Sequence, residues 1–189
     1  MAFNIQEFRS VVLENDPIRP TNFHVRFYPP TSILPLAPAG LINELEFWGE
    51  AAELPLLQHH TWQVQKWGYG AVEDRPLIPV YQEFRVTFIA DKAGAVWRFF
   101  KNWQKFVVEN DFNSGTKSQY ELAYRDEYLA DVQLQIYDKN TTSTEPSISV
   151  TMIEAFPYAM GSTRLDWGLQ NEIMRFPVSF RFKNWIEAT

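Results

Sequence analysis

Four apolar side chains near the C-terminus constrain the fold more than any other feature. Segment 176–183 alternates Phe176, Val178, Phe180 and Phe182 with polar residues or proline. A period of two is typical of a strand with one buried and one solvent-facing side. Burying all four side chains contributes about 6–12 kcal/mol, and a one-residue slip would expose them all. We therefore expect a core strand with a strongly specified register.

The same alternation predicts strands at 23–28, 43–48, 62–67, 83–90, 128–138 and 147–156. Residues 51–55 are expected to connect two of them, and residues 139–146 to form a hairpin tip. Pro29, Pro30, Pro35 and Pro38 predict an irregular loop or arm. Residues 165–172 predict a turn, with Trp167 as an aromatic anchor, that delivers the chain into the last strand.

Helical spacing appears in two places. Residues 4–14 predict a short helix. Residues 91–108 predict a long one, capped by Asp91, with apolar Val96, Phe100, Trp103 and Val107 on one side. Arg98, Lys101 and Lys105 cluster on the opposite side, and a polar linker follows at 110–117. Such a basic stripe is either solvated surface or a contact for an acidic protein partner.

Together these elements predict a mainly β (α+β) fold in which two packed antiparallel sheets, a β-sandwich or open barrel, are flanked by one long helix. With 189 residues we expect a single domain over 1–189. It would carry an N-terminal arm or helix at 1–20, a proline-rich insertion at 29–43 and an extended hairpin or loop at 68–79. That loop indicates either a contact with a neighbouring subunit or a plain surface hairpin.

Composition narrows the function classes. The net charge of −6 disfavours tight nucleic-acid binding, and the lack of cysteine excludes disulfides and thiolate chemistry. The N-terminus lacks a signal-peptide pattern and no run of eighteen apolar residues occurs, so we expect neither export by a signal peptide nor a membrane span. Thirty aromatic residues favour strands and interfaces.

No catalytic, cofactor or metal site is predicted. His59 and His60 are adjacent, so on a strand they point to opposite faces. Glu44 and Glu46 are expected to be exposed strand carboxylates. Gly68 and Gly70 lack the third glycine of a dinucleotide loop. We expect a protein that is not an enzyme and holds no cofactor.

Four sequence segments resemble those of a known protein family and occur in the same order along the chain. They are RPTNFHV at 19–25, ELP at 53–55, DR at 74–75 and, most specifically, LDWGLQNEI at 165–173. The chain resembles the tail tube proteins of contractile-tailed bacteriophages, which are related to the tube proteins of type VI secretion. The proline-rich 29–43 insertion and the long 138–146 hairpin depart from the family pattern.

The resemblance implies a structural virion protein that is assembled in the host cytoplasm. Hexameric rings would form a continuous lumen barrel and stack into a tube inside a contractile sheath, through which DNA is ejected. The implied partners are further copies, the sheath, the baseplate or tube initiator, the tail terminator, the tape measure protein and passing DNA, with no membrane. The chain would be the repeating subunit or the initiator at the baseplate junction.

Three sets of residues carry this hypothesis. The solvent-facing strand residues, neutral or acidic apart from Arg85, would line the lumen: Gln63, Gln65, Glu83, Thr87, Asp131, Gln133, Gln135, Ser149 and Thr151. The basic side of the long helix, Arg98, Lys101 and Lys105, would face the sheath. The extended loop would contact the next ring through Tyr69, Val72, Glu73, Asp74, Arg75 and Leu77.

The rival interpretation is a monomeric ligand- or carbohydrate-binding β-sandwich with a concave aromatic site. An enzyme ranks third, because the sequence offers no converging nucleophile, base or metal ligands.

Overall fold

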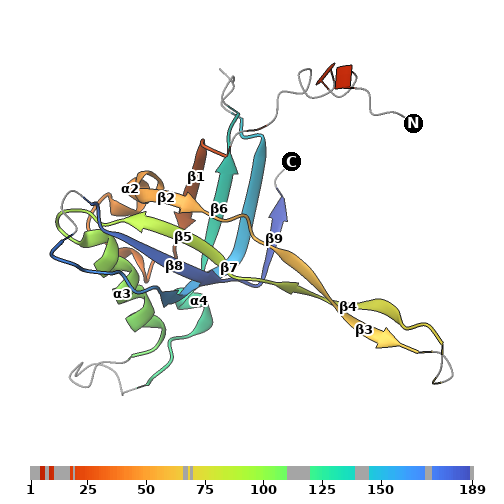
Figure 1. The fold of residues 1–189 in the computed structure, drawn as a ribbon. Helices are drawn as coiled ribbons and strands as arrows, with labels where there is room; N and C mark the ends of the chain where they lie inside the picture. Colours follow the sequence, from red (N-terminus) through yellow and green to blue (C-terminus); the bar gives the residue numbers. More distant parts are fainter. Residues whose placement is uncertain are drawn as a thin grey trace.

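Two antiparallel layers of strands face each other across the core (Figure 1). The structure is a computed structural model, and it describes residues 5–6, 9–10, 18, 20–65, 68, 70–109, 120–138, 145–168 and 172–187. The first layer holds β1 (Phe23–Tyr28), β6 (Ala130–Ile136), the first part of β7 (Ile148–Met160) and β9 (Asn184–Glu187). The second layer holds β2 (Gly49–Ala52), β5 (Phe84–Ile89), β8 (Arg175–Arg181) and the end of β7. The predicted pair of packed antiparallel sheets is confirmed.

Strand β7 joins the two layers through a bulge. Up to Ala155 it pairs with β6, and from Phe156 it pairs with β8. Glu154 adopts a positive φ of 55° at the register shift, where an extra residue bends a strand. The carboxylate of Asp131 accepts a hydrogen bond from the Glu154 backbone N–H. A hydrogen bond from Lys183 and the charge of Arg125 hold the pKa of Glu154 below its usual value.

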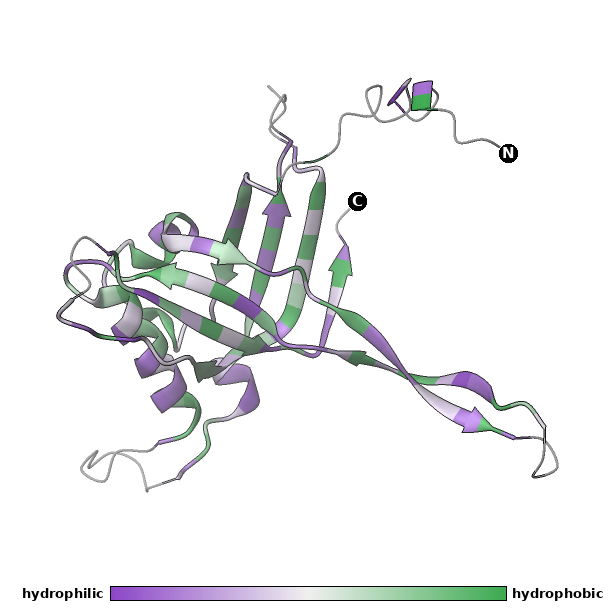
Figure 2. Cartoon of the chain, viewed as in Figure 1, coloured by the Kyte–Doolittle hydropathy of each residue, from purple (hydrophilic) through white to green (hydrophobic). Residues whose placement is uncertain are grey.

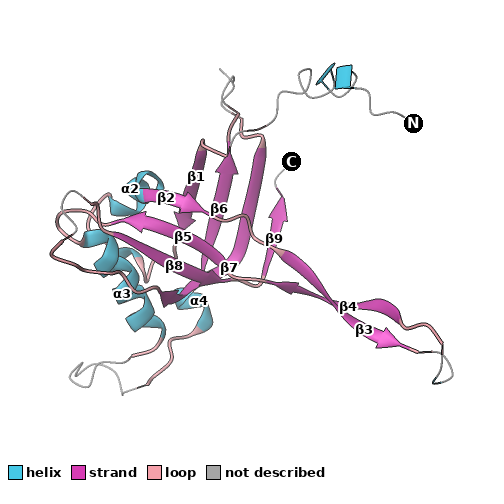
Figure 3. Ribbon diagram, in the orientation of Figure 1, coloured by secondary structure: helices cyan, strands magenta, loops and turns pink. Residues whose placement is uncertain are grey.

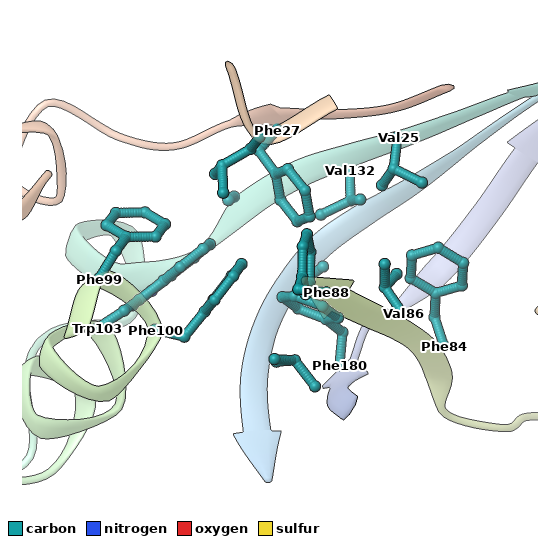
Figure 4. Close-up of a cluster of buried hydrophobic side chains, with 14 of the residues drawn as sticks. Val25, Phe27, Phe84, Val86, Phe88, Phe99, Phe100, Trp103, Val132 and Phe180 are labelled. Atoms are coloured by element: carbon teal, nitrogen blue, oxygen red, sulfur yellow. The ribbon is translucent and has the colours of Figure 1, made fainter. Parts of the chain in front are cut away.

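Aromatic rings fill the space between the layers (Figure 4). The ring of Phe180 lies 5.5 Å from that of Phe27, and Phe88 lies 4.8 Å from Phe100 of α3 (Ala95–Val107). Phe176, Val178 and Phe180 are fully buried, whereas Phe182 is half-buried against Tyr81. The register predicted for the last strand is confirmed, and the apolar side of α3 packs onto the rings as expected.

A two-stranded arm projects from this body (Figures 1 and 3). It consists of β3 (Leu57–Val64) and β4 (Glu73–Tyr81), whose residues are almost all exposed. Backbone hydrogen bonds from Glu53 N to Arg85 O and from Gln82 N to Leu56 O connect it to the body. The arm is thus the far end of one long hairpin, because β3 continues β2 and β4 leads into β5.

The strand predicted at 43–48 is wrong, because α2 (Leu41–Trp48) occupies this segment. Leu41 and Leu45 are buried while Asn43 between them is exposed, which fits helical spacing and breaks the alternation of a strand. The predicted connector at 51–55 begins inside strand β2. The proline-rich segment contains one short 3-10 helix, η1 (Leu34–Leu36).

Several boundaries also differ from the prediction. Helix α3 begins at Ala95 after Gly94, whose φ is 68°, so Asp91 is not its N-cap. The Asp91 carboxylate instead accepts hydrogen bonds from the backbone N–H groups of Ala93 and Val96. Burial opposes ionisation of Asp91, yet these backbone bonds hold its pKa below the usual value.

Strand β7 runs four residues further than predicted, and β9 and the short α4 (Arg125–Tyr128) were not predicted. The arm strand β3 begins five residues before the predicted strand at 62–67. Most of the helix expected at 4–14, the linker at 110–117 and most of the tip at 139–146 lie outside the described residues.

Candidate assembly surfaces

The outer face of the second layer carries a connected polar network. Arg85 donates hydrogen bonds to Glu83 at 2.7 Å and to Ser179 at 3.4 Å. The Tyr158 hydroxyl donates to the same Glu83 carboxylate, and the Arg181 guanidinium lies 4.8 Å from the Tyr158 ring centroid. These contacts join side chains of β5, β8 and the end of β7 across the outer face.

At the border of this face, Arg175 donates a hydrogen bond to Glu50 of β2. That bond, more than any other interaction, lowers the pKa of Glu50. Both arginines that contact a carboxylate here, Arg85 and Arg175, therefore have part of their charge balanced within the chain.

The outer face of the first layer carries a different network. The Tyr28 hydroxyl donates to Gln133, whose amide donates to the hydroxyl of Ser149 at 3.1 Å. The Tyr137 hydroxyl donates to Gln135 at 3.0 Å. Gln135 and Ser149 lie on the outer side of their strands as predicted, but in the single chain they are only 8% and 4% exposed. Neighbouring side chains on the same face cover them.

The nine residues predicted to line a lumen fall into three places. Glu83 and Thr87 belong to the outer face of the second layer. Gln63 and Gln65 lie on the arm or directly after its first strand. The remaining five belong to the outer face of the first layer: Asp131, Gln133, Gln135, Ser149 and Thr151. Since the two layers face each other across the core, their outer faces point in opposite directions. A single channel can therefore be lined by only one of the two outer faces.

The two layers differ in how their edges are covered. Helix α2 lies beside the free edge of β1, because its Leu45 is buried in the core while Glu46 reaches the outer face and binds Arg26 at 3.0 Å. In the second layer, β2 pairs only with β5 among the described strands. Residues 156–160 of β7 likewise pair only with β8 there. Among the described strands, the second layer thus has no strand partner at either edge in the single chain.

The exposed side of α3 is basic, but only two of its three predicted basic residues are exposed. Arg98 and Lys101 are exposed, and the Lys101 ammonium lies 5.3 Å from the ring centroid of Trp97. Lys105 is half-buried and lies 3.7 Å from the carboxylate of buried Glu109. The predicted stripe therefore presents two accessible charges, while the third is neutralised within the chain.

The arm combines backbone and apolar side chains that one chain leaves uncovered (Figure 2). Trp62, Val72, Leu77 and Ile78 are all more than half exposed. An isolated two-stranded ribbon is at best marginally stable in water, so docking would stabilise it. Of the residues predicted to contact the next ring, four lie on β4, Val72 directly precedes it, and Tyr69 lies outside the described residues.

Of the turn predicted at 165–172, residues 169–171 lie outside the described residues; Trp167 and Gly168 do form a turn, but the tryptophan does not anchor the core. Trp167 is fully exposed and Leu165 is 80% exposed. Asp166 accepts hydrogen bonds from Gly168 N at 2.9 Å and Arg164 at 2.7 Å, and the Gly168 bond is the main reason its pKa is lowered. The turn is ordered by its own polar contacts and leaves its apolar residues accessible.

Within the part of the chain that the structure describes, no three acidic, histidine or cysteine residues gather into a group that could hold a metal ion. In that part, no helix is long and apolar enough to cross a membrane.

Comparison with known proteins agrees with the fold. A family model described as "Phage tail tube protein" matches residues 18–188. No curated protein matches the chain. A chain of the anti-feeding prophage baseplate is similar, with a TM-score of 0.60, 12% identity, and coverage of 91% of this chain and 95% of that one.

Two further solved structures have the same fold. The tube terminating cap of the anti-feeding prophage gives a TM-score of 0.58 at 15% identity, covering 92% of this chain and 91% of that one. A sheath-tube complex of an extracellular contractile injection system, in the extended state, gives 0.56 at 11% identity and covers 99% of both chains.

Proposed function

Because the chain belongs to the phage tail tube protein family, we propose that it forms hexameric rings that stack into the inner tube of a contractile tail. The observation that carries the proposal is the second layer, whose β2 edge and β7 end both lack a strand partner among the described strands. Joining unlike edges of successive copies closes a ring and leaves no edge of the second layer free.

The second layer would then form the lumen wall, with Glu83, Arg85, Thr87 and Ser179 toward the channel. Two arguments compete here. Charge favours the first layer, whose outer face is nearly neutral, whereas edge geometry favours the second. Geometry decides, because a ring cannot close through an edge that α2 covers. In the second layer, Arg85 and Arg175 are balanced by Glu83 and Glu50, and Arg181 lies against the Tyr158 ring.

The absence of cysteine allows a direct test of the lumen assignment. Thr87→Cys and Thr151→Cys form a matched pair, because both threonines are half-buried on outer strand faces of opposite layers. In assembled tubes a bulky maleimide is expected to modify Thr151→Cys and to spare Thr87→Cys, since a long tube excludes the reagent from its channel. A small maleimide on disassembled protein controls for intrinsic reactivity. The reverse pattern would assign the first layer to the lumen.

The sheath would contact the exposed side of α3. Reversing both accessible charges, Arg98→Glu with Lys101→Glu, is expected to weaken co-assembly with the sheath protein and to leave tube formation intact, because neither residue lies at an edge of the second layer. Co-sedimentation with sheath measures the first effect, and microscopy of the variant alone measures the second. Failure of the tubes themselves would move α3 into a contact between tube subunits.

The arm would contact the next ring through the apolar residues near its tip, including Val72 and Leu77. The tube would conduct DNA without sequence-specific contacts, hold the tape measure protein during assembly, and meet a terminator at one end and the baseplate at the other. We favour the repeating subunit over the initiator of the baseplate junction. Open-ended growth of the purified protein supports the repeating subunit, and isolated rings support the initiator.

A further inference from the structure

The two strands of the arm differ in proline content. Strand β4 contains Pro76 and Pro79, whereas β3 contains no proline. Pro76 lies opposite Thr61, and Pro79 lies opposite His59. Proline lacks the N–H that a ladder requires and is found in strands where its nitrogen faces away from the paired strand.

Both prolines occupy the same kind of position in the hydrogen-bond ladder between β3 and β4. In an antiparallel pair, residues alternate between those whose N–H and C=O point to the partner strand and those whose groups point away. Residues three apart would normally differ in phase. A register shift at His60 and Thr61 leaves Leu77 as an extra residue between the two prolines, so Pro76 and Pro79 share one phase. Both nitrogens therefore point out from the free edge of β4.

The free edges of β3 and β4 therefore differ in their ability to pair with a further strand. The free edge of β4 lacks a donor at residues 76 and 79, so a further strand would find few N–H groups there. Thr61 and His59 stand opposite these prolines, so their own N–H and C=O groups point out from the free edge of β3. Only the β3 edge presents a full row of donors and acceptors.

We propose that a second copy of this chain adds a strand to the outer edge of β3, and that Pro76 and Pro79 keep the β4 edge from pairing. The inference rests on the proposed function, because it requires copies that assemble. Strand β3 continues β2, so this edge extends the open β2 side of the second layer. The same layer ends on its other side in the open edge at 156–160, where Pro157 removes one donor and leaves the carbonyls. Pairing of unlike edges is the kind of contact that closes a ring.

Two proline substitutions test whether the β3 edge pairs with another copy and the β4 edge does not. Thr61→Pro removes an N–H that points out of β3, and Asp74→Pro removes one that points out of β4, since Asp74 is two residues from Pro76. Neither removes a hydrogen bond between β3 and β4. Thr61→Pro is expected to raise the protein concentration needed for assembly by about tenfold or more, whereas Asp74→Pro leaves it within about twofold of the value for Asp74→Ala, which lacks the same side chain but keeps the N–H. Thr61→Val controls for the side chain, and thermal melting checks that the body stays folded.

The outcomes are distinct. Assembly of Thr61→Pro at the wild-type concentration would overturn the inference, as would a block by Asp74→Pro equal to that by Thr61→Pro. Wild-type protein that never assembles would contradict the proposed function itself.

Discussion

Replacing Phe180 with alanine is expected to lower the free energy of unfolding by about 3–5 kcal/mol. The side chain is fully buried, and its ring lies 5.5–6.4 Å from the rings of Phe27, Phe84, Phe100 and Trp103. It therefore joins both layers and α3, and the cavity left by alanine has rings on several sides that cannot all close in. Because whole domains are stable by only about 5–15 kcal/mol, this is a large fraction of the total.

Denaturant-induced unfolding followed by circular dichroism measures this loss. Phe182→Ala is the control, because Phe182 lies on the same strand face two residues later but is only half-buried. It is expected to cost clearly less than Phe180→Ala. Equal losses for the two variants would mean that the core does not centre on Phe180.

Removing the arm is expected to abolish stacking into tubes without unfolding the body. Residues 57–81 can be replaced by an Asn-Gly turn that joins Leu56 to Gln82, because the backbone of these two residues already forms a hydrogen bond of 3.1 Å. The arm packs on little besides itself, so the melting temperature should change by only a few degrees, about the effect of 1 kcal/mol. Light scattering should report no species larger than a single ring.

The matched control keeps the arm and changes one exposed polar side chain outside the predicted contact set, for example His60→Gln on β3. This variant should assemble, because the backbone edges and the apolar residues of the arm are unchanged. Normal tubes from the arm deletion would show that the arm has no part in assembly.

The sequence predicted the core residues well in strands and helices that bury one side only. The alternation at 176–182 identified Phe176, Val178 and Phe180, and helical spacing identified Val96 and Trp103, because burial on one side leaves a clear period. It failed at 41–48, where Leu41 and Leu45 fit a helix while residues 43–48 also fit an alternating strand.

Three features could not be predicted from the sequence pattern, for physical reasons. Periodicity shows which residues of a strand share a face, but not which way the face points, so the predicted lumen set mixed Thr87 with Gln133 from opposite layers. The bulge at Glu154 gave no signal, because a positive φ is expected from glycine rather than glutamate. The arm resembled an ordinary strand because its apolar residues, such as Trp62, alternate although the single chain buries neither face.

Electron microscopy of the purified protein across a concentration series, with light scattering for mass, tests the central claim most directly. We expect hollow tubes of uniform width that lengthen with concentration, built from rings of six subunits. A protein that stays monomeric across the whole series would contradict self-assembly through the open edges of the second layer, and would favour the monomeric binding domain instead.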